Sequence, residues 1–297
     1  MKQAIAELLE SRLERLINRR ESESLRMIDD MQKVENKYEL LKRRNVDLMK
    51  GKVRVSIQKV ADSSRTEKEI EYKAHYQFLY NDHAKLYIEE TVENRKALFY
   101  LEEIISDREL PFPFQEASAE LEAEEEDFPR TNFHYDRLAA VQYAERWWDS
   151  ENPAYKNFDV NCTNFISQCL HAGGAKMRGY PNRSSGWWMQ NNNWSYSWTV
   201  ANSMRMFLPQ SKTGLRGREV STAQQLMPGD VIAYDFQGDG RYDHTTFVVA
   251  KDKSQMPLVN AQTYNSRMRY WSYEDSTAYT PNIKYKFFHI IDDSSKK

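Results

Sequence analysis

A buried helix that begins at a cysteine is predicted by Asn161-Cys162-Thr163-Asn164-Phe165-Ile166-Ser167-Gln168. Asn161 is a good N-cap residue, and apolar residues recur at helical spacing until Gly173-Gly174 ends the pattern. Cys162 is therefore expected in the first turn, where unpaired N–H groups and the helix dipole stabilise a thiolate. Cys169 falls on the apolar stripe and is expected to be inert packing. The sequence thus indicates one candidate nucleophile, Cys162.

A histidine at the start of an apolar strand supplies a candidate base. Gly229-Asp230-Val231 is typical of a turn that feeds a strand, and a loop then leads to a second strand at residues 246–250. His244 lies at the mouth of that strand, held by rigid backbone and open on one side, which suits a general base. The other histidines have no comparable setting: His75, His83, His134, His171 and His289.

Two amides on the following strand are candidates for a third catalytic role. Residues 257–263 alternate so that Asn260 and Gln262 share one face. A polar side chain there can accept the imidazole N–H and fix the tautomer and ring orientation of the base. Asn260 is the first choice and Gln262 the second. Neither carries charge, so either would orient the imidazole and not form an ion pair with it.

All seven tryptophans lie in the second half of the chain. Residues 184–199 mix tryptophans with amides and serines, a composition that suits no regular amphipathic element. Such a segment fits the core, or equally the wall of a cleft that holds a sugar or peptide by flat apolar contact and amide hydrogen bonds. The candidate substrate-binding residues are Trp187, Trp188, Trp194 and Asn161.

These ordered motifs resemble the putative amidase domain family of Gram-positive bacteria, which is similar in its Cys-then-His order to the CHAP and NlpC-type papain-like peptidoglycan hydrolases. The resemblance covers about residues 133 to 291 and implies a papain-like fold with a thiol nucleophile at Cys162 and a base at His244. Two positions depart from the family. Asn161 stands where the family commonly has Asp, and relatives often carry His in the strand of Asn260 and Gln262.

The N-terminal half is predicted to be a separate helix-and-sheet module. Apolar residues recur at helical spacing from 2 to 50, with a change of register near 20–24, so one long or two consecutive amphipathic helices are expected. These helices pack on their own domain or mediate self-association or docking of a partner. Alternating residues then predict an antiparallel sheet up to about 105. The expected α+β organisation is a module at 1–105, an acidic proline-containing linker at 106–132 and a hydrolase domain at 133–292.

Charge and composition argue against several other classes. The net charge of -2 gives no global reason to bind nucleic acid or an anionic membrane. No apolar window is long enough for a membrane span or a signal peptide, so the cytoplasm is the default location. The two cysteines lie too far apart on one helix for a disulfide, and no zinc motif can be assembled. Residues 235–243 resemble a calcium loop without its closing Glu, and a tight acidic hairpin explains them equally well.

The sequence therefore predicts a cysteine amidase or peptidase. It is expected to hydrolyse a peptide-type amide, with peptidoglycan as the candidate substrate, through a thiolate acyl-enzyme and without cofactor or metal. One alternative is a catalytically inactive papain-like binding module recruited through its N-terminal helices. Another is acyl transfer to an amine in place of water.

Overall fold

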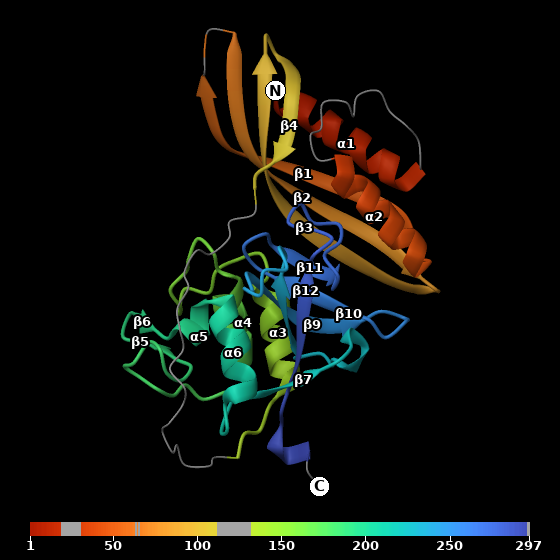
Figure 1. Cartoon of the computed structure of the whole chain (residues 1–297). Helices are drawn as coiled ribbons and strands as arrows, with labels where there is room; N and C mark the ends of the chain where they lie inside the picture. Colours follow the sequence, from red (N-terminus) through yellow and green to blue (C-terminus); the bar gives the residue numbers. More distant parts are fainter. Residues whose placement is uncertain (19–30, 63, 65, 112–131, 296–297) are drawn as a thin grey trace. The chain divides into compact units, whose positions relative to one another are not determined.

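The computed structural model describes residues 1–18, 31–62, 64, 66–111 and 132–295, and it divides the chain into two compact units (Figure 1). Unit 1 comprises Met1–Phe112 and Tyr264–Tyr279. Unit 2 comprises Pro113–Thr263 and Thr280–Lys297. A short segment from late in the sequence therefore belongs to the unit that the N-terminal residues build, although the sequence places it inside the hydrolase domain at 133–292.

Unit 1 packs two helices beside long antiparallel strands (Figure 1). Their bounds are α1 Lys2–Asn18, α2 Met31–Arg44, β1 Asp47–Asp62, β2 Glu67–Asp82, β3 Lys85–Tyr100, β4 Glu103–Glu109 and β11 Ser266–Tyr270. The strand order is β1-β2-β3-β11, and β4 also pairs with β3. One face of β2 is buried through Tyr72, Tyr76 and Phe78, which alternate with more exposed residues as half-buried strands do. The predicted helix-and-sheet plan is confirmed for this unit.

The predicted change of helix register and most of the predicted linker fall outside the described residues. α1 ends at Asn18 and α2 begins at Met31, so the predicted break near 20–24 falls in the undescribed stretch between them. β4 extends to Glu109, which places a strand where the sequence predicts the first residues of the linker. Residues 112–131, with the acidic run, are not described.

Unit 2 gathers helices beside antiparallel strands (Figure 1). Its helices are α3 Arg137–Trp147, α4 Cys162–Ala172, α5 Tyr196–Thr199 and α6 Ala201–Gln210. Its sheet has the order β10-β9-β8-β12-β7, formed by β7 Gly217–Val220, β8 Val231–Asp235, β9 His244–Lys251, β10 Pro257–Ala261 and β12 Lys284–Ile290. A separate short hairpin joins β5 Met189–Gln190 to β6 Asn193–Trp194. The predicted α+β class is confirmed. In the described part of the chain, no helix is long and apolar enough to cross a bilayer.

α4 is the central helix of unit 2, because every residue from Cys162 to Leu170 is buried. Phe165, Ile166 and Cys169 form the predicted apolar stripe and are fully enclosed. The helix ends at Ala172, and Gly174 follows with a positive φ of 96° that suits glycine. The first residue of this buried helix is the cysteine that the sequence singles out.

Candidate active site

Asn161 precedes α4 as predicted, but its side chain does not cap the helix. The side-chain amide instead donates to Gln262 Oε1, and its oxygen accepts from Phe158 N at 3.2 Å and from Asn164 Nδ2 at 2.8 Å. Asn161 is thus enclosed by protein groups and only 6% exposed. These contacts stabilise the start of α4, and the role of Asn161 in substrate binding stays a prediction.

Thr263, which lies just after the end of β10, caps the start of α4 in place of Asn161. Its hydroxyl oxygen accepts from Asn161 N at 2.8 Å and from Cys162 N at 3.1 Å. A hydroxyl that accepts the first N–H groups of a helix performs the role usually taken by an N-cap side chain. Thr263 adopts a φ of +87°, a strained conformation for a β-branched residue. Sequence reasoning missed it because a capping residue is normally sought next to the helix, and this one lies about a hundred residues away.

The sulfur of Cys162 is buried between α4 and β9. Its side chain is 1% exposed, and Sγ lies 3.7 Å from Thr163 Oγ1, which in turn lies 3.1 Å from Thr245 Oγ1. Burial raises the pKa of the Cys162 thiol, while hydrogen bonds from the N–H and hydroxyl groups of Thr245 and Thr163 act to lower it. Burial thus outweighs the depression expected at a helix end, and the pKa of the Cys162 thiol is raised.

His244 is the first residue of β9, as predicted, and is 1% exposed. Its ring packs with the rings of Tyr234 and Phe236, at centroid distances of 5.7 and 6.1 Å. Successive strand side chains point to opposite faces, so the next residue, Thr245, is turned toward α4. The structure therefore places Cys162 beside Thr245, the residue that follows the predicted base His244.

The two candidate orienting amides make contacts that anchor α3. Asn260 Nδ2 donates to Glu145 Oε1 at 2.8 Å and to the carbonyl of Ala144 at 3.3 Å. Gln262 donates to the carbonyl of Ser150 at 2.8 Å and to that of Trp147, and its oxygen accepts from Asn161. Gln262 thus ties the end of α3 to the start of α4. Its role in these contacts is to position the cysteine helix.

Two of the three candidate substrate-binding tryptophans belong to the core. Trp187 and Trp188 are 1% and 0% exposed, and their indole N–H groups donate to Ser167 Oγ and to backbone carbonyls. Other protein groups enclose both side chains, and their assignment as substrate-binding residues stays a prediction. Trp194 is half-buried and lies under Lys156 Nζ at 4.5 Å and Arg183 Cζ at 5.1 Å from its ring centroid. Two cations therefore flank the ring of this partly exposed side chain.

Gly229-Asp230-Val231 has a structural role. The buried Asp230 carboxylate accepts from Arg137 Nη1 at 2.7 Å, from Ile290 N at 3.0 Å and from the ring of His289 at 2.9 Å. Gly229 takes a positive φ of 95°, which the turn into β8 requires. This motif joins α3 to β8 and β12, and so holds the sheet that carries His244.

The loop between β8 and β9 is the tight acidic hairpin that the sequence allows. Asp235 accepts from the backbone N–H groups of Gly238 at 2.7 Å and Gly240 at 2.8 Å, as in an Asx turn. Within the described ranges, no group of three or more His, Cys, Asp or Glu side chains is arranged to hold a metal ion. Asp235 therefore serves the turn itself.

Asp243, beside His244, carries a perturbed carboxyl. Burial and the charges of Asp239 and Asp235 raise the pKa of Asp243 to about 6. Because the folded pKa lies above the unfolded value, this group stabilises the fold at low pH, and that contribution is lost as the pH rises through about 6. Among the described residues, its Oδ2 is buried without a hydrogen-bond partner. The buried surroundings of Asp243 thus favour the protonated carboxyl over the ionised one.

Asp243→Asn is accordingly expected to raise the free energy of unfolding by about 1 to 3 kcal/mol at pH 7.5 and to change it little at about pH 3, below the unfolded pKa. Urea unfolding at the two pH values measures the difference. Asp159→Asn, at an exposed position, is the control and should show no such pH dependence. An equal effect of Asp243→Asn at both pH values would contradict the assignment of a raised pKa.

With the fold and site described, comparison with known proteins gives the class: the chain belongs to the family described as "Putative amidase domain", which matches residues 134–288. Along its whole length it is similar to Uncharacterized protein YhbB of Bacillus subtilis (strain 168), with 54% identity over 306 residues and 98% of that relative covered. Uncharacterized protein YjcM of the same organism is 29% identical over 126 residues, which cover 39% of this chain and 28% of YjcM. No solved structure matches significantly.

The family points to amide hydrolysis in general terms. Its matched range holds every candidate residue discussed above, from Asn161 to Gln262. The similarity to CHAP and NlpC-type enzymes stays a prediction.

Proposed function

We propose that the chain is a cysteine-dependent amidase whose nucleophile is Cys162. The observation that supports this most directly is the setting of the sulfur. It lies at the first residue of a buried helix, where N–H and hydroxyl groups of Thr163 and Thr245 are directed at it. These donors have little to bind on a neutral thiol, whereas they stabilise a thiolate once it forms. For Cys169, which lies seven residues later on the same helix, burial raises the pKa well above the ordinary thiol value, and the hydrogen bond that acts to lower it comes from its own backbone.

The reaction follows the ordinary chemistry of acyl transfer to a thiol. The Cys162 proton passes to a base, and the thiolate attacks the carbonyl carbon of the amide. The C–N bond then breaks, the amine leaves with the proton, and a thioester remains on Cys162. Water attacks the thioester and releases the acid and the free thiol. Because burial raises the pKa of Cys162, a base has to remove its proton as the reaction begins.

His244 is the proposed base. It directly precedes Thr245, whose hydroxyl and backbone face the Cys162 side of β9. Because successive strand residues face opposite sides, the His244 ring lies on the face of β9 away from Thr245, where it packs with Tyr234 and Phe236. The ring therefore has to turn toward α4 before it can take the Cys162 proton.

The substrate is proposed to be a peptide-type amide that carries carboxylates, with the peptides of peptidoglycan as the first to test. Trp194 is partly exposed, and Lys156 and Arg183 place two cations beside its ring. This group is linked to the cysteine helix, because Asn164 Nδ2 donates to the carbonyl of Lys156 at 2.9 Å. Aromatic contact combined with cations favours an anionic peptide over a neutral sugar.

The test is incubation of the wild-type chain and of Cys162→Ala with purified peptidoglycan, followed by mass spectrometry of the released fragments. The proposal expects fragments that carry a new carboxyl group and that are absent with the variant. Addition of a primary amine separates hydrolysis from acyl transfer, since transfer would place the amine on the product. Fragments released equally by both proteins, or by neither, would contradict the proposal.

A further inference from the structure

We propose that Thr245 is a further catalytic residue: its backbone N–H and its hydroxyl hold the Cys162 sulfur once the proton has left, and Thr163 positions that hydroxyl. The catalytic consequence rests on the function proposed above. The effect on the thiol does not, and it is measured without a substrate.

Two N–H groups at the start of α4 are already bonded to another residue. The backbone N–H groups of Asn161 and Cys162 both donate to Thr263 Oγ1, at 2.8 and 3.1 Å. A helix end stabilises an anion chiefly through unpaired N–H groups, and these two are paired. In this first turn, the N–H of Thr163 is the group directed at the sulfur. Further donors to a thiolate therefore have to come from outside the helix.

Strand β9 supplies these donors through Thr245. The register of β9 with β10 runs from Lys251 to Phe247, and Thr245 lies two residues beyond its end, which leaves its N–H for the sulfur. Its hydroxyl forms a second hydrogen bond with the sulfur, and both contacts act to lower the pKa of the Cys162 thiol. A thiol is a weak acceptor, whereas a thiolate binds N–H and O–H donors strongly. These contacts gain strength as the proton leaves, which is the property of a group that assists the reaction.

Thr163 fixes the direction of the Thr245 hydroxyl. The two hydroxyl oxygens lie 3.1 Å apart, and Thr163 Oγ1 lies 3.7 Å from the sulfur. Both threonines are 0% exposed, so water does not replace either partner. In the proposed arrangement the Thr163 hydroxyl donates to Thr245 Oγ1, and the Thr245 proton is left for the sulfur. The restricted rotamers of β-branched side chains help to keep the two hydroxyls in this arrangement.

The next residue of β9 provides a matched control. Thr246 is also 0% exposed, but its side chain points to the opposite face, where its hydroxyl lies 3.0 Å from the hydroxyl of Tyr234. Thr245→Val and Thr246→Val each remove one buried hydroxyl and leave a neighbouring hydroxyl without that partner. Of the two, Thr245→Val alone removes a donor to Cys162.

The experiment measures how fast iodoacetamide alkylates Cys162 in the folded full-length chain as the pH is raised, by peptide mass spectrometry. Thr245→Val is expected to raise the midpoint of this rate by about one pH unit. At a pH below both midpoints the rate should fall about threefold, because the thiolate is about tenfold scarcer but about threefold more nucleophilic. Thr245→Ser and Thr246→Val keep the donor and should stay within about 1.5-fold of the wild type.

Equal rates for Thr245→Val and Thr246→Val, or a loss that Thr245→Ser does not restore, would overturn the proposal. Cys169 in the same sample reports on opening of the fold, and faster labelling of both cysteines in Thr245→Val would show a merely structural role. Thr163→Val tests the hydroxyl pair independently, in case Thr245→Val fails to fold. It should slow alkylation about twofold, since Thr245 keeps its hydroxyl but loses the group that orients it. An unchanged rate in Thr163→Val would contradict the positioning role.

Amide hydrolysis is the second readout. The rise of kcat/KM with pH should move upward by about one unit in Thr245→Val and stay in place in Thr246→Val, because this profile reports the ionisation of the free enzyme. If alkylation follows the expected pattern while no protein hydrolyses an amide, the role of Thr245 at the thiol stands and the proposed function fails. If hydrolysis is observed and the profile of Thr245→Val does not move, the function stands and Thr245 is not catalytic.

Discussion

Replacement of Cys162 by alanine is expected to lower amide hydrolysis at least about 1,000-fold, because the variant has no atom that can form the acyl-enzyme. The measurement is the initial rate of fragment release from the preferred substrate at saturating concentration. The fold should persist, since the side chain that is removed is small and α4 keeps its Thr263 cap. Circular dichroism of the variant checks this point.

Cys169→Ala is the matched control for this result. Cys169 is also buried on α4, and burial raises the pKa of its thiol well above the ordinary value. Its loss leaves a small cavity that costs about 1 to 2 kcal/mol of stability but touches none of the groups around Cys162. Activity should remain within about twofold of the wild type. A Cys162→Ala variant that kept a tenth of the activity, or a Cys169→Ala variant that lost it, would contradict the assignment of the nucleophile.

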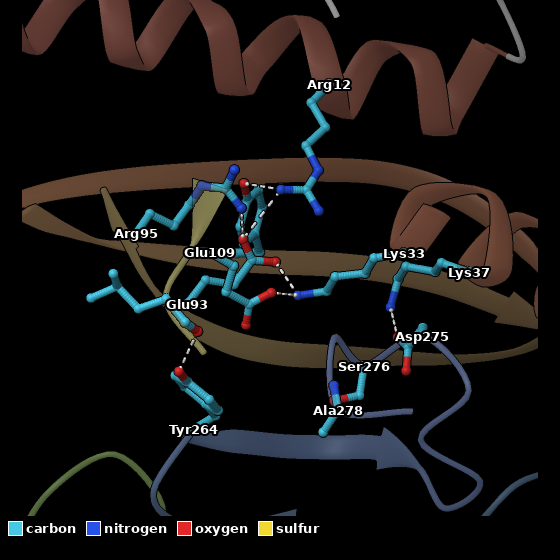
Figure 2. Close-up of polar contacts among 12 residues, drawn as sticks. Arg12, Lys33, Lys37, Glu93, Arg95, Glu109, Tyr264, Asp275, Ser276 and Ala278 are labelled. Atoms are coloured by element: carbon cyan, nitrogen blue, oxygen red, sulfur yellow. Dashed lines mark hydrogen bonds and ion pairs between the residues drawn. The ribbon is translucent and has the colours of Figure 1, made fainter. Parts of the chain in front are cut away.

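Arg95→Met is expected to lower the stability of unit 1 by about 3 to 5 kcal/mol, because it removes the cation beside the buried carboxylate of Asp107. Arg95 is 0% exposed and donates through Nη1 to Glu93 at 2.8 Å (Figure 2) and through Nε to Asp107 at 2.8 Å. Asp107 is fully buried as well, so solvent cannot replace the lost partner. Urea unfolding followed by circular dichroism measures the effect.

Lys96→Met at the next position is its control. Lys96 pairs with Glu69 at 2.5 Å, but both side chains keep contact with water. Such surface pairs contribute less than about 1 kcal/mol. Similar losses of stability in the two variants would show that the buried network around Arg95 does not hold the sheet together.

Local patterns in the sequence predict much of the fold. α4 starts at Cys162 as expected, because the apolar spacing begins after Asn161. The glycines that follow Ala172 define its end. β9 begins at His244 because an apolar run follows a polar turn. In the N-terminal half, the alternation of β2 and β3 is visible in the sequence for the same reason: each strand has one buried face.

The rest depends on contacts between distant residues, which periodicity does not encode. Thr263 caps a helix that begins about a hundred residues earlier. The tertiary burial of Cys162 decides the direction of its pKa shift, against the local helix dipole. Trp188 lies in a polar-looking stretch, yet its indole N–H finds carbonyl partners in the core. Asp275 belongs to unit 1 because Lys37 and Arg269 reach it, although their sequence positions give no sign of this.

The central claim is that the Cys162 sulfur is a nucleophile, and its most direct test is alkylation of the folded chain. Iodoacetamide labelling of Cys162 and Cys169 is followed by peptide mass spectrometry between pH 6 and pH 10. We expect Cys162 to react at least about tenfold faster than Cys169, with a rate that rises with pH toward a midpoint above the ordinary thiol value of about 8.5. Equal rates for the two cysteines, or no labelling of Cys162 in the folded chain, would contradict the account.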